Sequence, residues 1–240
     1  MLSMQLSRRV LVGRSVLGLG LAAFGLSSGL ARAADGAAPP AAAPGAAPGG
    51  APGGAQGAAS DQAAIVAPIA ALNAGLIRVM QAGKKTPFQQ RFDMLAPTID
   101  RAFDLPQILQ VSVGTVWSNL APAQQSALLA TFRRYTVASY VDNFDSFDGE
   151  HFDLQPQTRA VVGGEQVVLT RIVARSGETH QLDYVMRSTV DGWKAVDVLA
   201  DGSISRVAVQ RSDFRHLLDR GGATALMASL QQKVEELSRG

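Results

Sequence analysis

The chain has 240 residues and no cysteine, a length that suits one domain with additional segments. Disulfide frameworks, cysteine-ligated zinc and thiol catalysis are therefore excluded. The formal charge is +2, but residues 1–33 contain four arginines and no acid. Without these arginines the 22 basic residues fall to 18 against 20 acidic ones, so the remainder is slightly acidic and no groove for nucleic acid is expected.

Residues 1–33 are predicted to be an export signal. A basic start precedes a mostly apolar run over residues 16–30, and Ala31-Arg32-Ala33 matches an A-x-A cleavage site. The pair Arg8-Arg9 permits the twin-arginine route, and the Sec route is equally open. The alternative is an uncleaved membrane anchor, which the short apolar run and the cleavage site disfavour. We expect cleavage near Ala33.

Residues 34–60 consist almost entirely of alanine, proline and glycine. Such a stretch cannot bury enough apolar surface to offset the entropy lost on ordering it. We predict a disordered linker that acts as a spacer, followed by one α+β domain over residues 61–240.

The first part of this domain has the hydrophobic spacing of helices. Pro68 suits the first turn of a first helix, and Gly83 suits its end. Thr86-Pro87-Phe88-Gln89 predicts a capping box for a second helix. Pro97 interrupts that helix and should kink it.

Two further helices are predicted before the pattern changes. Asp104-Leu105-Pro106-Gln107 has the residues of another helix start. Ala121-Pro122 begins the longest helix, which is expected to reach about Phe147, and its apolar stripe is rich in aromatic residues.

After Glu150 the hydrophobic period becomes two, which is typical of strands. Short glycine-containing turns separate the strands, so they should form a curved antiparallel meander. Two helices separated by Gly221-Gly222 close the chain. The predicted fold is therefore α+β, with N-terminal helices, a four-stranded antiparallel meander and C-terminal helices. The four strands are expected at residues 152–162, 166–174, 180–190 and 193–199.

The stretch 191–220 carries the most specific motif of the chain. A turn, a strand, a second turn and a helical pattern follow one another without interruption. This stretch resembles the MlaC family of periplasmic phospholipid-binding components of lipid ABC transport systems, and its hopanoid-associated branch (HpnM) is the most similar branch we can suggest. Gln210 departs from the pattern, because the family often has an aromatic residue there. The residues that carry the resemblance are Trp193, Lys194, Asp197, Val198, Asp201, Gly202, Arg211, Ser212 and Phe214.

The resemblance implies an NTF2-like cup in which helices and sheet enclose an apolar cavity. It also implies a periplasmic carrier of a phospholipid, or of a hopanoid. The implied partners are an outer-membrane lipid complex and an inner-membrane MCE-domain ABC transporter, and no cofactor is implied. A carrier needs only a dry cavity and an entrance for the headgroup, because each buried methylene contributes about 0.8 kcal/mol.

The residues predicted to contact the lipid are apolar or aromatic side chains of the predicted helices and strands, together with one arginine. Arg211 is expected near the cavity mouth or paired with Asp197. The complete set is Phe103, Leu105, Ile108, Val111, Trp117, Phe132, Tyr135, Tyr140, Phe144, Leu169, Leu182, Tyr184, Met186, Val196, Val198 and Arg211.

Two other functions stay open at this point. A small enzyme on the same cup would need paired acids or a His–Asp couple, whereas the acids of this chain fall mostly at turns and helix ends. The histidines His151, His180 and His216 lie in different predicted elements, so neither a catalytic nor a metal site is predicted. An exported adaptor that holds no ligand is the second alternative, and a fully packed interior would favour it.

Overall fold

The computed structural model describes residues 53–239. The predicted export signal and residues 34–52 of the predicted linker lie outside this part of the chain. Helix α1 (Gly53–Ala82) begins within the predicted linker, so helical structure starts before the expected boundary at Asp61. Pro68 consequently lies inside α1 and not in its first turn.

Within residues 53–239, four α-helices and one short 3₁₀ helix precede the sheet, and the hydrophobic spacing predicts the four α-helices. After α1 these elements are α2 (Phe88–Ala102), α3 (Leu105–Val113), the short 3₁₀ helix η2 (Gly114–Asn119) and α4 (Pro122–Asn143). The helix predicted to be the longest, α4, is shorter than α1, with 22 residues against 30. It also ends before the expected Phe147, because Phe144 leaves the helical region with φ −115° and ψ 56°.

The two predicted helix caps have different outcomes. The Asp104 carboxylate accepts a hydrogen bond from the Gln107 backbone N–H at 3.1 Å, which confirms the predicted start of α3. The capping box at Thr86 is wrong: the Thr86 hydroxyl donates to the Ala82 carbonyl at 2.9 Å, at the end of α1. Pro87 stands at the N-cap of α2 without a side-chain hydrogen bond.

The predicted meander is confirmed, with one addition. Consecutive strands pair antiparallel, and the spatial order β1-β2-β3-β4-β5 follows the chain. The additional strand, β5, has only two residues, which is too short to give an alternating pattern. The strands are β1 (His151–Ala160), β2 (Gln166–Val173), β3 (Thr179–Thr189), β4 (Gly192–Ala200) and β5 (Ile204–Ser205).

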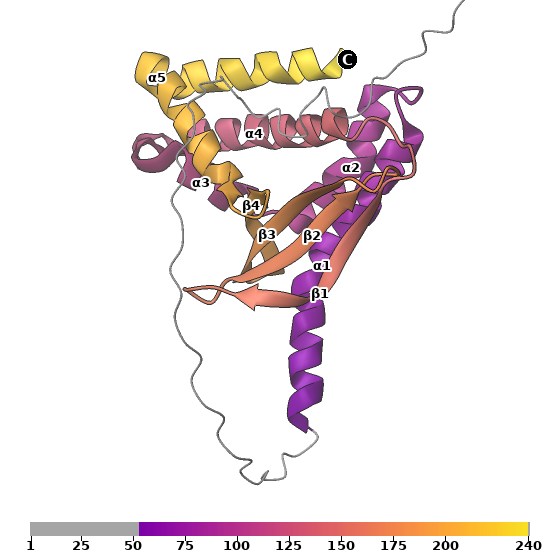
Figure 1. Cartoon of the computed structure of the whole chain (residues 1–240). Helices are drawn as coiled ribbons and strands as arrows, with labels where there is room; N and C mark the ends of the chain where they lie inside the picture. The colour runs from indigo at the N-terminus through magenta and orange to yellow at the C-terminus, as the bar shows by residue number, and fades with distance from the viewer. Residues whose placement is uncertain (1–52, 240) are drawn as a thin grey trace, which may run out of the picture.

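Helix α5 (Arg206–Ser238) is bent at the predicted glycine pair. Gly222 has φ 61° and ψ −157°, a conformation that is essentially restricted to glycine. We call residues 206–220 the proximal half and residues 223–238 the distal half. Figure 1 shows the distal half beside α4, whereas the proximal half descends towards β4.

The core lies between the helices and one face of the sheet. Among the described residues, the segment Ser60–Ala82 of α1 is long and apolar enough to cross a membrane. Leu72 and Leu76 of this segment are fully buried in the core, and a core helix meets the same criterion. The apolar residues of this α1 segment are therefore explained by its packing against α2 and the sheet.

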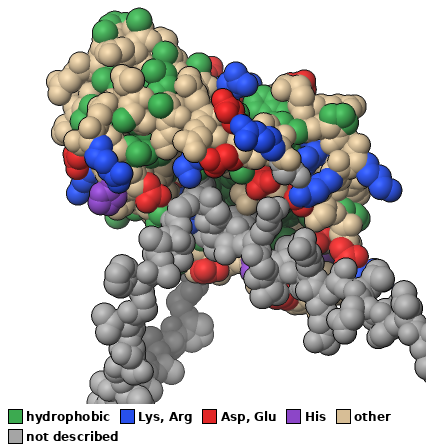
Figure 2. Space-filling view, turned by 90° about the horizontal axis from the view of Figure 1, so that it is seen from above, with side chains coloured by type: hydrophobic (Ala, Val, Ile, Leu, Met, Phe, Trp, Pro, Cys, Tyr) green, Lys and Arg blue, Asp and Glu red, His purple; other side chains and the backbone are tan. Residues whose placement is uncertain are grey.

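Acidic and basic side chains are interspersed on the face seen in Figure 2, in which the molecule is viewed from above. No field of one sign covers the visible surface of that face, as a site for the nucleic-acid backbone would require.

Candidate functional site

A cavity of about 100 Å³ lies between α3, α4, the proximal half of α5 and the end of β4. Each of these elements contributes side chains, so the cavity depends on the whole arrangement and not on one local motif. Its lining residues are Phe103, Leu105, Ile108, Phe132, Tyr135, Thr136, Ser139, Tyr140, Asn143, Phe144, Leu182, Asp197, Val198, Arg206, Val207 and Gln210.

Aromatic rings form much of the cavity wall. The rings of Phe103 and Tyr140 have centroids 5.7 Å apart, and Tyr140 stacks on Phe144 at 6.0 Å. The Phe132 ring meets Phe214 edge to face at 6.3 Å. Each such pair contributes about 0.5–1.5 kcal/mol beyond the burial of its area, so the aromatic stripe of α4 gives the cavity a firm apolar side.

Two buried tyrosines, one in this wall and one behind it, remain neutral. Tyr140 and Tyr184 are hydrogen-bonded to each other through their side chains. Burial raises the pKa of both hydroxyls above the usual value, because it disfavours the charged phenolate. The interior therefore carries no tyrosinate charge at neutral pH.

The cavity has one polar end, formed where α5 begins. Arg206 is half-buried there, and burial lowers the pKa of its guanidinium, while nearby Tyr135, Asp213 and Asp197 act in the opposite direction. An arginine stays protonated under ordinary conditions. Arg206 therefore adds a positive charge to a wall that is otherwise mostly apolar or neutral.

Asp197 fastens the end of β4 to the first turn of α5. Its carboxylate accepts hydrogen bonds from the Ser205 hydroxyl and from the backbone N–H of Val207 at 3.0 Å. The predicted pair of Asp197 with Arg211 is therefore replaced by contacts to the start of α5. Arg211 is exposed, and its Nη2 lies 3.8 Å from where a Cβ on Gly114 would stand.

Nine of the sixteen residues predicted to contact the lipid line this cavity, and their role in binding stays a prediction. They come from the α2–α3 connection, from α3, from the α4 stripe that ends at Phe144, and from strands β3 and β4. The nine are Phe103, Leu105, Ile108, Phe132, Tyr135, Tyr140, Phe144, Leu182 and Val198.

The seven others lie elsewhere in the structure. Tyr184 and Met186 are buried in the core behind the wall. Val111 is 39% exposed and Trp117 is partly exposed, and neither is among the residues that line the cavity. Leu169 lines a mostly polar hollow; Val196 and Arg211 complete the seven.

Val196 leaves the cavity face because β4 contains an irregularity. Met186 pairs with Ala195, whereas Val185 pairs with Asp197, so Val196 is the extra residue of a bulge. The alternation of side chains changes phase there: Ala195 and Val198 share one face through their partners Met186 and Tyr184, whereas regular alternation would place Val196 on that face.

The sequence interpretation missed Arg206 as a cavity residue. Arg206, Val207 and Gln210 lie within one turn of each other at the start of α5, and all three line the cavity. Their i, i+4 spacing after the recognised strand is the signal that would have found them.

A set of helices over one face of an antiparallel meander, with an aromatic-walled cavity between the layers, defines a small binding domain of the carrier type. No group of histidines and acids within residues 53–239 could hold a metal ion. The cavity is therefore the feature that marks the class of this protein.

Comparison with known proteins identifies the family. Residues 71–232 match the family described as MlaC protein, so the chain belongs to the MlaC family. Members of this family are periplasmic, non-enzymatic lipid carriers. The prediction that the chain is not an enzyme is thereby confirmed.

A solved structure has the same fold. It is a phospholipid-binding protein from Ralstonia solanacearum in complex with a phospholipid, 20% identical, with a TM-score of 0.62. The match covers 74% of this chain and 98% of that one. No curated protein matches the chain.

Proposed function

We propose that this protein is a periplasmic carrier of phospholipid. An acyl chain of the bound lipid would enter the cavity between α4, the proximal half of α5 and the sheet. The observation that carries the proposal is the position of this cavity: it collects most of the predicted lining residues and has one cationic end. The family, and the phospholipid bound to the Ralstonia protein, support the same cargo class.

The chemistry of the cavity suits a phospholipid better than a neutral hopanoid. Apolar walls favour hydrocarbon at about 25 cal/mol for each Å² removed from water. Arg206 offers a planar cation, which binds phosphate oxygens through paired hydrogen bonds. A hydrocarbon polycycle without phosphate offers no oxygens for such hydrogen bonds.

The small volume of the cavity favours a second candidate, an adaptor that holds no ligand. About 100 Å³ is room for a few water molecules, well below the 300–1,000 Å³ of ordinary ligand sites. A carrier must therefore widen this cavity when it loads, whereas an adaptor need not. This contrast gives the two functions different experimental outcomes.

The proposal extends to location and partners. The apolar segment and cleavage pattern of residues 1–33 support export by the Sec or the twin-arginine route, with removal of the signal near Ala33. The carrier would receive or deliver lipid at an outer-membrane lipid complex and at an MCE-domain ABC transporter of the inner membrane. Residues 34–52 would add length between the cleavage site and α1.

Native mass spectrometry of protein purified from its own periplasm tests the cargo. We expect a population whose excess mass equals one glycerophospholipid, and tandem dissociation should release that lipid. An excess mass that fragments as a hopanoid would replace the cargo but keep the carrier. Protein that is free of lipid, and that takes up none from phosphatidylglycerol vesicles after delipidation, would support the adaptor.

A further inference from the structure

A second hollow, an open groove of about 1220 Å³, runs along the outer side of α1. The last turn of α2, the start of β1 and the β3–β4 turn form its other borders. None of its lining residues belongs to the lining of the cavity described above. The groove is therefore a separate surface, and small alanine side chains of α1 give it a shallow apolar floor.

One buried amide in the wall of this groove has no hydrogen-bond partner. Asn73 is 6% exposed, and neither its Nδ2 nor its Oδ1 is paired within the described part of the chain. Native proteins rarely leave such groups unsatisfied. The side chain requires both an acceptor and a donor, which is the pair that a peptide backbone presents.

Three basic side chains also line the groove without an ion pair. Arg78 and Arg101 are exposed and Lys194 is partly exposed. None of the three contacts a carboxylate of the described residues at ion-pair distance. The carboxylates that line the groove are Asp191 and Glu150, and Glu150 is buried and accepts the Asp148 backbone N–H at 2.7 Å. The exposed charge is therefore mainly positive.

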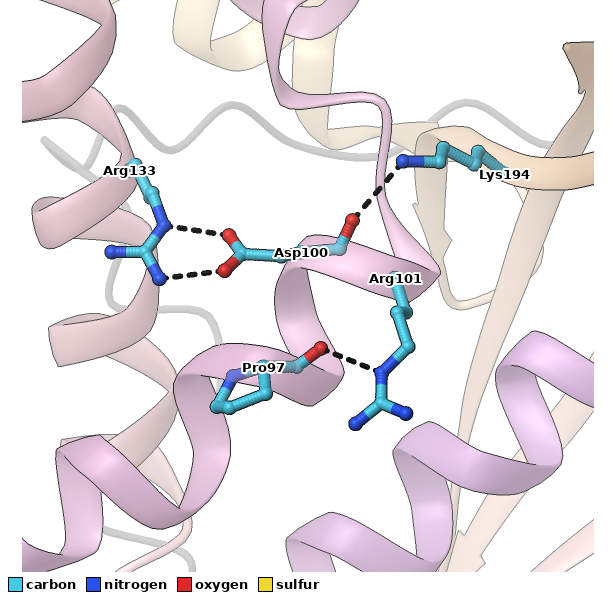
Figure 3. A network of polar contacts seen from close by, with 5 residues as sticks. All are labelled: Pro97, Asp100, Arg101, Arg133 and Lys194. Atoms are coloured by element: carbon cyan, nitrogen blue, oxygen red, sulfur yellow. Dashed lines mark hydrogen bonds and ion pairs between the residues drawn. The ribbon is translucent and has the colours of Figure 1, made fainter. Parts of the chain in front are cut away.

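Backbone contacts hold two of these cations at the groove. Lys194 Nζ donates to the Asp100 carbonyl at 3.2 Å, and Arg101 Nε donates to the Pro97 carbonyl at 3.0 Å. The Asp100 carboxylate is occupied on the other side by Arg133, at 2.6 Å for both hydrogen bonds (Figure 3). Lys194 and Arg101 thus keep further N–H donors for another molecule.

We propose that this groove binds an extended, acidic segment of a partner protein. The backbone of the segment would pair with the Asn73 amide, its carboxylates would face Arg78, Arg101 and Lys194, and the half-buried Trp193 would cover its apolar side chains. A hydrocarbon ligand would leave the amide unpaired, and the positive charges select against a basic segment.

The test uses the full chain and a phage-displayed library of random peptides. We expect the selected peptides to be enriched in aspartate and glutamate. Fluorescence anisotropy of a selected peptide should show binding that weakens at least tenfold in the double variant Arg101→Glu/Lys194→Glu and falls with added salt. Arg215→Glu, an exposed site on α5, is the matched control and should bind as the wild type does.

Asn73→Leu separates recognition from folding. Leucine removes the unpaired amide, so the melting temperature should be equal to that of the wild type or higher, while the peptide should bind about three- to tenfold more weakly. Failure to select any peptide, selection without an acidic bias, or binding that is unchanged by charge reversal would overturn the proposal. Binding to phosphatidylglycerol vesicles that is lost on charge reversal, without peptide selection, would identify a membrane surface instead and overturn it equally.

Discussion

Arg206 places a positive charge in the cavity wall at the point where α5 begins. Its guanidinium is half-buried, which lowers its pKa without removing its charge, and Asp197 and Tyr135 lie near enough to affect that pKa. A partly desolvated cation interacts more strongly with an anion than an exposed one does, because less water screens it. A phosphate at the cavity mouth would therefore gain more from Arg206 than from the exposed Arg211.

Substituting Arg206→Gln should weaken phosphatidylglycerol binding about ten- to hundredfold, the loss expected for a hydrogen bond to a charged group. Arg211→Gln is the matched control, because Arg211 lies outside the cavity beside Gly114, and its affinity should stay near that of the wild type. Displacement of a fluorescent fatty acid measures both. Equal losses in the two variants would show that Arg206 has no special place in binding.

The elements of this fold differ in how fully the sequence determines them. The four strands and the break at Gly221-Gly222 depend on local signals, namely alternation and glycine conformation, and were predictable. The bulge at Val196 was not, because it is a shift in the register between β3 and β4, and register depends on the pairing of two strands and not on a local pattern. The same shift explains one difference at the candidate site. Val196 does not line the cavity although Val198 does, whereas the predicted residues of α4 line it.

The glycine break in α5 has a measurable energetic role. Alanine at Gly222 would occupy a glycine-only conformation and should cost about 1–3 kcal/mol. For a domain of this size, each kcal/mol lowers the melting temperature by about 2–4 °C. Thermal unfolding followed by circular dichroism measures this loss for Gly222→Ala.

Thr224→Ala is the control for this substitution, since it places alanine at an exposed helical position two residues further on. Its effect should stay within about 0.5 kcal/mol of zero. If Gly222→Ala also left the free energy of unfolding unchanged, α5 could lose its bend without a cost in stability, contrary to this prediction.

At the scale of the whole molecule, stability and lipid uptake make opposite demands on the same space. A cavity of about 100 Å³ keeps the empty protein well packed, yet an acyl chain requires more room. We expect the proximal half of α5 to provide it by moving away from α4. Asp197 holds the first turn of this half, and the glycine break separates it from the distal half, where Leu226 and Leu230 are buried in the core.

A substitution that fills the cavity should therefore preserve stability and reduce lipid uptake. Val198→Phe places a ring into the existing space, so the melting temperature should be unchanged or higher, as in other cavity-filling substitutions, while phosphatidylglycerol uptake should fall at least tenfold because the acyl chain loses its place. Val190→Phe, at the fully exposed β3–β4 turn, supplies the same chemical change outside the cavity and should leave uptake unaltered. Uptake is measured by native mass spectrometry after incubation with vesicles. If the Val198 variant is as stable as the wild type and still loads lipid equally well, the acyl chain lies somewhere other than between α4, α5 and the sheet.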